Sequence, residues 1–293
     1  MIRLERIRTE KAIPSDFRGQ KRVQLNERLI EQKKNGVLDG PSTQKWDASI
    51  WKKAKAQLLR ESRNKCAYCE TPVTVTAYGD VEHFRPKSVY WWLAYSYENY
   101  LPSCIVCNQQ FKKDAFPLDA AGKRWTGPAV SARLTAVRQS ALARKLNPDP
   151  LNEQEGMTQR SFTAAIRKEK ALIIDPYAED PSVYLAYEAV VTTRQVLVRA
   201  ASPAYQPVVD ACEQYFGINR NDLADLRFQA YVHYMTYRHL LEEPRLPETI
   251  KKSIRLRLKE MAVEKAAYAG MIRYFDTQPL KDLLWSFDLT LSG

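Results

Sequence analysis

Apolar residues recur at helical spacing over most of the second half of the chain. Residues 222–243 and 248–275 repeat apolar positions every three or four residues, as an α-helix with one buried face requires. Asn219 or Asn221 can cap the first of these helices, and Pro247 can open the second. The same period predicts shorter helices over residues 23–34, 46–64, 131–146, 161–174 and 208–217. We therefore expect a fold of the α+β class that is mostly α.

Two stretches favour β-strands instead. Residues 73–84 carry β-branched and aromatic residues around Gly79 and Asp80, which predicts a hairpin whose second strand holds residues 81–83. Residues 184–200 predict a second hairpin or pair of strands. After Pro102 the chain can turn and enter a short helix, which completes a β-β-α unit in the first half of the protein.

Turn-forming residues divide the chain into four parts. Gly, Pro and Asn are spaced through residues 121–160, which we interpret as a linker region. This region separates a compact module at residues 66–120 from an α-rich domain at residues 161–293. Residues 1–65 form a basic N-terminal helical segment that we expect to pack on the module.

Composition and charge narrow the classes of function. The chain has 293 residues, of which 45% are hydrophobic, and no apolar run long enough to span a membrane. Its start is too charged for a signal peptide, so we expect a cytoplasmic protein with no membrane partner. The net charge of +11 fits a nucleic-acid partner but is also common in proteins without one. Residues 1–65 carry most of this surplus, with 17 Lys and Arg against 8 Asp and Glu. The lysine face of the helix at 46–64 is interpreted as solvated.

Four of the five cysteines form two pairs with the spacing of a zinc site. Cys66 and Cys69 enclose two residues, and Cys104 and Cys107 repeat that spacing. Four thiolates in two tight turns suit a tetrahedral zinc ion that stabilises the fold. Redox pairs and unliganded buried cysteines are the alternatives. We expect the fifth cysteine, Cys212, to be an inert buried thiol in a helix.

Between the two cysteine pairs the chain resembles the HNH endonuclease motif, also called the ββα-metal fold. The resemblance rests on Glu82 and His83 in a Glu-His-x-x-Pro element, on Asn99, and on Asn108 directly after the second cysteine pair. It implies that His83 is the general base that takes a proton from water and that Asn99 orients it. It also implies that Glu82 and Asn108 bind a catalytic divalent ion.

Asparagine at position 108 stands where the motif more often has histidine. Other members of the superfamily use asparagine here, so we interpret Asn108 as a variant ligand. Magnesium or manganese suits such an oxygen-rich site better than a soft metal. An imidazole can accept a proton near neutral pH, since its reference pKa is about 6.5.

Four basic residues surround the motif. Each could neutralise a phosphate of a nucleic acid, and ordinary solvated charge is the alternative for each. These residues are Arg85, Lys87, Lys112 and Lys113.

A longer resemblance links the chain to the PtuB family of HNH proteins, found in Septu anti-phage systems and some retrons. It rests on residues 65–70, 81–88, 99–108, 116–117 and, more weakly, 172–188 and 216–227. The resemblance implies a defence nuclease that works with a separate ABC-type ATPase. We expect its substrate to be nucleic acid and favour DNA over RNA, although the sequence leaves both open. Two other functions remain open: a zinc-stabilised nucleic-acid-binding protein, and an interaction subunit without catalysis.

Overall fold

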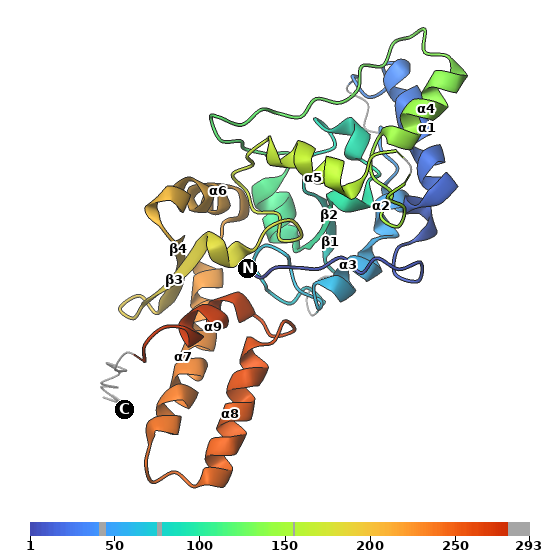
Figure 1. Ribbon diagram of the computed structural model, residues 1–293. Helices are drawn as coiled ribbons and strands as arrows, with labels where there is room; N and C mark the ends of the chain where they lie inside the picture. Colours follow the sequence, from blue (N-terminus) through green and yellow to red (C-terminus); the bar gives the residue numbers. More distant parts are fainter. Residues whose placement is uncertain (41–44, 75–77, 155, 281–293) are drawn as a thin grey trace.

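Two short antiparallel strands lie inside the larger body of the protein, and helices from both halves of the chain surround them (Figure 1). The computed structural model describes residues 1–40, 45–74, 78–154 and 156–280. Strand β1 (Asp80–His83) pairs with strand β2 (Tyr100–Ser103), and the π-helix η4 (Val106–Lys112) follows β2. This is the β-β-α order that the sequence predicts.

The partner of β1 differs from the one predicted. The sequence suggested a hairpin over residues 73–84, but β1 pairs with β2, so that His83 lies opposite Tyr100. Residues 75–77 of the expected hairpin lie outside the described part of the chain. Two short 3-10 helices, η2 (Trp91–Leu93) and η3 (Tyr97–Asn99), connect the strands and bury their aromatic side chains. The long connection between β1 and β2 therefore contributes aromatic side chains to the hydrophobic core.

The N-terminal part packs on this unit. It begins with the 3-10 helix η1 (Ser15–Phe17) and helix α1 (Gly19–Lys34). The helix predicted over residues 46–64 is split into α2 (Ala48–Lys52) and α3 (Lys55–Glu61). Helix α3 contacts both β1 and β2, while α1 contacts η2.

The described part of the region predicted to be a linker, residues 121–160, contacts the rest of the protein at several positions. Helix α4 (Ala136–Lys145) lies beside α1 (Figure 1). Near this contact Asn147 Nδ2 donates to Asn26 Oδ1 at 2.8 Å, and both side chains are fully buried. Trp125 meets Trp92 edge-on, with ring centroids 5.4 Å apart. The turn-forming residues therefore shape a packed segment rather than a flexible connection.

The C-terminal half is helical with one hairpin, as predicted. Its elements are α5 (Gln159–Arg167), η5 (Pro181–Val183), β3 (Leu185–Val190), β4 (Gln195–Ala200), η6 (Pro203–Tyr205), α6 (Gln206–Phe216), α7 (Asn221–Glu242), α8 (Glu248–Ala262) and α9 (Ala269–Asp276). Strands β3 and β4 pair with each other. Helices α7 and α8 extend away from the larger body (Figure 1). No helix in the described ranges combines the length and the apolarity needed to cross a membrane.

Two details of this half differ from the prediction. The helix expected over residues 248–275 is broken after Ala262, because Val263 takes an extended conformation (φ −72°, ψ 155°), and α9 starts only after Tyr268, which is left-handed (φ +57°). Asn219 does not cap α7. Its side chain instead accepts from the backbone N–H of Val198 at 2.7 Å and donates to the carbonyl of Val198 at 3.1 Å.

One cluster of buried apolar side chains runs through every part of the described chain, without a break near residue 120 or 160. Tyr68 stacks on Phe216 of α6 with ring centroids 3.9 Å apart. Gly217 lies so close to Phe111 of η4 that an added Cβ would be 2.4 Å from the ring, and its φ is +56°. The module and the α-rich half therefore share a core.

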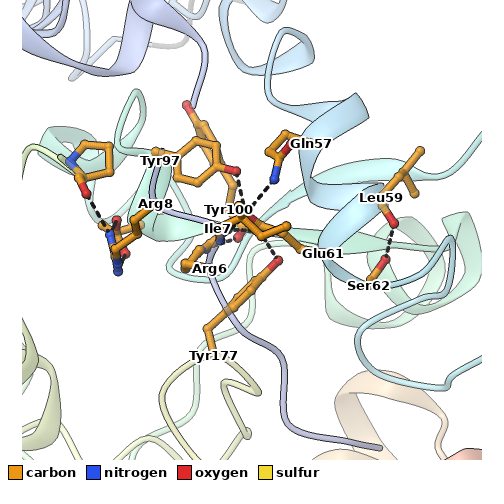
Figure 2. A network of polar contacts seen from close by, with 12 residues as sticks. Arg6, Ile7, Arg8, Gln57, Leu59, Glu61, Ser62, Tyr97, Tyr100 and Tyr177 are labelled. Atoms are coloured by element: carbon orange, nitrogen blue, oxygen red, sulfur yellow. Dashed lines mark hydrogen bonds and ion pairs between the residues drawn. The ribbon is translucent and has the colours of Figure 1, made fainter. Parts of the chain in front are cut away.

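A buried carboxylate joins three of these parts. Glu61 of α3 has a fully buried side chain, and its neighbour Arg6 also donates to the Tyr100 carbonyl of β2 at 2.5 Å (Figure 2). The donors to the Glu61 carboxylate are Arg6, Ile7, Gln57, Tyr97 and Tyr177, at 2.7 to 3.3 Å. A buried charge with this many partners fixes the segments that supply them.

Replacing Glu61 by alanine should therefore lower the free energy of unfolding by about 3–5 kcal/mol, because Arg6 would stay buried without its counter-charge. Urea denaturation measures the loss. Glu264→Ala is the control. This residue forms an exposed ion pair with Arg63, and its loss should cost less than about 1 kcal/mol. Equal, small losses in both variants would contradict the role given to Glu61.

Candidate functional site

The four paired cysteines converge on one point. Their sulfur atoms all lie within 4.8 Å of one another, and the Cys69 and Cys104 sulfurs are 3.9 Å apart. A tetrahedral zinc ion with Zn–S bonds of about 2.3 Å places its sulfurs about 3.8 Å apart. Three of the cysteines are buried and Cys104 is partly buried. The cluster therefore has the chemistry and the spacing to hold a metal ion such as zinc.

Donors lie close to two of the four sulfurs. The backbone N–H of Cys107 lies 3.4 Å from the sulfur of Cys104, and Arg220 Nη1 lies 3.8 Å from the sulfur of Cys107. Hydrogen bonds from the neighbouring thiols lower the pKa of Cys69 and of Cys104, whereas burial raises the pKa of Cys66 and hydrogen bonds with neighbouring thiols raise that of Cys107. Arg220 lies just before α7, so the C-terminal half helps to complete the cluster.

A second group of predicted residues lines one cavity, which we call the His83 cavity. Its volume is about 390 Å³, and Glu82, His83 and Asn108 all line it. Strand β1 supplies the first two residues and η4 supplies the third. The antiparallel pairing of β1 with β2, followed directly by η4, brings these distant positions together.

His83 is held in one orientation. Its Nε2 lies 2.9 Å from the carbonyl oxygen of Ala94, so this nitrogen carries the proton and donates, and Nδ1 is left as the acceptor. The rings of Trp51 and Tyr100 meet the imidazole edge-on, at 5.0 and 5.1 Å between centroids. Burial and the charge of Lys87 lower the pKa of His83 to about 3. The ring is therefore neutral at physiological pH, and in this environment it is a much weaker base than the reference imidazole from which proton acceptance near neutral pH was expected.

Asn99 clamps the backbone just after β1. Its Oδ1 accepts from the N–H of Arg85 at 2.9 Å, and its Nδ2 donates to the carbonyl of Arg85 at 2.9 Å. Its own carbonyl accepts from the N–H of Phe84 at 2.9 Å. Asn99 is fully buried and does not line the His83 cavity. It is placed to position the strand that carries His83.

Glu82 is buried but has a counter-charge. Lys112 Nζ lies 2.5 Å from Glu82 Oε1 and donates to the carbonyl of His83 at 3.1 Å. Burial raises the pKa of the Glu82 carboxyl, and the Lys112 ammonium acts in the opposite direction. The Lys112 ammonium is closest to Oε1, and no hydrogen bond from another described residue reaches Oε2 of Glu82. This oxygen can therefore act as a ligand.

Asp80 is a residue of the cavity that the sequence analysis missed. Its Oδ2 accepts from Asn108 Nδ2 at 3.2 Å and from Gln109 Nε2 at 2.8 Å. With its amide nitrogen engaged, Asn108 can present its side-chain oxygen elsewhere. The available signal was the strand period, because Asp80 and Glu82 are two residues apart in β1 and share a face.

Two of the four predicted phosphate-binding residues do not face solvent. Arg85 is buried, and its Nε donates to Glu169 at 2.6 Å, while Lys112 is fully buried against Glu82. Neither is free to bind a phosphate, so that expectation is corrected for both. Lys87 and Lys113 do line the His83 cavity. Lys52 and Lys55 line it too, although their helix face was interpreted as solvated.

The glutamate that pairs with Arg85 comes from far along the chain. Glu169 Oε1 also accepts from the hydroxyl of Tyr90 at 2.5 Å and from the N–H of Trp125 at 3.0 Å. Its side chain is fully buried. Arg85 therefore ties the end of β1 to the segment after α5.

Two curated bacterial proteins are similar to part of this chain. The chain is 40% identical over 85 residues to Septu protein PtuB of Bacillus mycoides (strain KBAB4), which covers 24% of the chain and 29% of that protein. It is 46% identical over 63 residues to Septu protein PtuB of Bacillus thuringiensis, which covers 20% of the chain and 24% of that protein. The match thus spans less than a third of either relative. No family model and no solved structure matches the chain.

The cysteine cluster generates a prediction about metal content. Cys69→Ser should reduce bound zinc from about one ion per chain to near zero and lower the unfolding midpoint, because the remaining thiols cannot close a tetrahedral site. Elemental analysis and thermal denaturation measure the two effects. Cys212→Ser is the control, since Cys212 is buried but lies outside the cluster. Loss of zinc from Cys212→Ser, with zinc retained in Cys69→Ser, would overturn the assignment of zinc to the cysteine cluster.

Proposed function

We propose that this chain is a metal-dependent HNH-type endonuclease that hydrolyses phosphodiester bonds of nucleic acid, preferably DNA, in the His83 cavity. One observation carries the proposal. A neutral imidazole, held by the Ala94 carbonyl so that Nδ1 is its acceptor, lines the same cavity as the Glu82 carboxylate and the Asn108 amide. A base and two oxygen ligands are the groups that metal-assisted hydrolysis requires.

His83 acts as the general base. Nδ1 takes the proton of the attacking water, and the ring keeps its place because Nε2–H remains bonded to the Ala94 carbonyl. The edge-on contacts with Trp51 and Tyr100 oppose rotation of the ring as its charge changes. Asn99 acts indirectly, by fixing the backbone of Arg85 two residues later.

Glu82 and Asn108 would hold the divalent ion. Carboxylate and amide oxygens are hard ligands, which fit magnesium or manganese and do not fit the metal of the cysteine cluster. When bound, such an ion stabilises negative charge on the phosphate and on the leaving oxygen. Lys52, Lys87 and Lys113 at the cavity would bind the flanking phosphates of the substrate.

We also propose a role in anti-phage defence, in complex with an ABC-type ATPase. The partial similarity to the two Septu PtuB proteins supports this role. The α-rich half is the proposed docking region, because α7 and α8 extend from the body that holds the His83 cavity (Figure 1).

Purified protein should cut duplex DNA in the presence of magnesium or manganese, and His83→Ala should slow cleavage at least about a hundredfold because the base is lost. Gel assays with duplex DNA, single strands and RNA measure the rates. His233→Ala, at an exposed position of α7, should cut like the parent. Zinc content should match in all three proteins, and His83→Ala should stay folded at the temperature of the assay although the loss of its buried ring lowers the unfolding midpoint. Unchanged cleavage by His83→Ala would refute the mechanism, and no cleavage of any substrate by the parent would favour a binding or interaction subunit.

The partner proposal has a separate test. Co-expression with an ATPase encoded beside this gene should give a complex that survives size-exclusion chromatography. His83→Ala should form it equally well, because the base is placed in a cavity away from α7 and α8. A chain that elutes alone in the presence of the ATPase would contradict the docking proposal.

A further inference from the structure

Two adjacent lysines of the His83 region have opposite environments. Lys112 is the last residue of η4, and its side chain is fully buried. Lys113 is exposed and lines the His83 cavity. The backbone turns sharply between them, because Lys113 has a φ of +50° and leaves the helix. The two adjacent lysines therefore differ in what their ammonium groups can contact: Lys112 contacts buried protein groups, and Lys113 contacts the cavity.

Lys112 contacts both residues that the proposed mechanism takes from β1. Its ammonium lies 2.5 Å from Glu82 Oε1 and 3.1 Å from the carbonyl oxygen of His83. Lys112 also lies one turn after Asn108 on η4, so the same short helix supplies a proposed ligand and this cation. The ammonium thus joins η4 to β1 at the point where the two meet.

We propose that Lys112 is a positioning residue that holds Oε1 of Glu82 and so leaves Oε2 as the single oxygen that Glu82 offers to a divalent ion. The inference rests on the proposed function only in taking Glu82 as a ligand. The ammonium is closest to Oε1, Oε2 accepts no hydrogen bond from another described residue, and Glu82 lines the His83 cavity. A carboxylate with one oxygen occupied binds through the other oxygen alone.

Single-oxygen binding has a consequence for the ion. With one carboxylate oxygen bound, more coordination positions of the ion would remain for water and substrate oxygens, as in the magnesium sites of phosphoryl-transfer enzymes. Without the ammonium, Glu82 could turn and bind with both oxygens. The ion would then be held at least as tightly, because a positive charge next to its ligand is gone, but in the wrong place for hydrolysis.

The experiment compares Lys112→Met with Lys113→Met, two isosteric changes at adjacent positions. Lys112→Met should lower kcat about tenfold or more at saturating manganese and leave KM for a DNA substrate little changed. Lys113→Met should raise KM and leave kcat little changed, because an exposed lysine at the cavity acts on substrate binding. Manganese binding to each zinc-loaded protein, followed by electron paramagnetic resonance, gives a readout that needs no activity. Lys112→Met should bind manganese at least as tightly as the parent.

Three outcomes would overturn the inference: parental kcat in Lys112→Met, the same kinetic change in both variants, or loss of manganese binding in Lys112→Met with an unchanged unfolding midpoint. If Lys112→Met unfolds, Lys112→Leu, which also removes the ammonium and carries no donor, takes its place under the same criteria. A parent protein that cuts nothing but binds manganese would refute the proposed function, and the binding comparison would still decide the role of Lys112.

Discussion

The arrangement around the His83 cavity depends on one small ladder of four residue pairs between β1 and β2. Two strands of this length are marginal alone in water, so both ends need support. At one end Asn99 bonds both backbone groups of Arg85, and at the other end β2 leads into the second cysteine pair. The cysteine cluster and the asparagine clamp therefore fix the register that sets Glu82 and His83 beside Asn108.

Buried charges extend this support into distant parts of the chain. Glu61 draws donors from the N-terminal segment and from Tyr177, while Glu169 receives Arg85 at the end of β1. Breaking one partner of such a pair leaves a buried charge, which costs far more than an exposed pair is worth. Several basic residues are thus buried in ion pairs within the protein. The positive charge counted from the sequence is therefore larger than the positive charge that the surface can offer to nucleic acid.

The sequence was enough to predict the cysteine cluster but not the packing around it. Spacing alone indicated that the four cysteines converge. The pattern of residues 73–84, with a short helix after Pro102, predicted a β-β-α unit but gave β1 the wrong partner. It could not reveal that β1 would pair with β2, because strand alternation says nothing about partners. The burial of Arg85 was equally hidden, since its partner Glu169 lies 84 residues away. The helical period of the sequence also continues through residues 263–268, where the backbone leaves the helical conformation.

The central claim is that the His83 cavity is a divalent-metal site separate from the cysteine cluster. The most direct test is anomalous diffraction from crystals of the zinc-loaded protein soaked in manganese. The account predicts one zinc peak among the four cysteine sulfurs and one manganese peak in the His83 cavity, in contact with Glu82 Oε2 and the side-chain oxygen of Asn108. The claim would be contradicted if manganese bound only at other positions. In that result the His83 cavity would show no manganese peak, and Glu82 and Lys112 would keep the positions that they have in this structure.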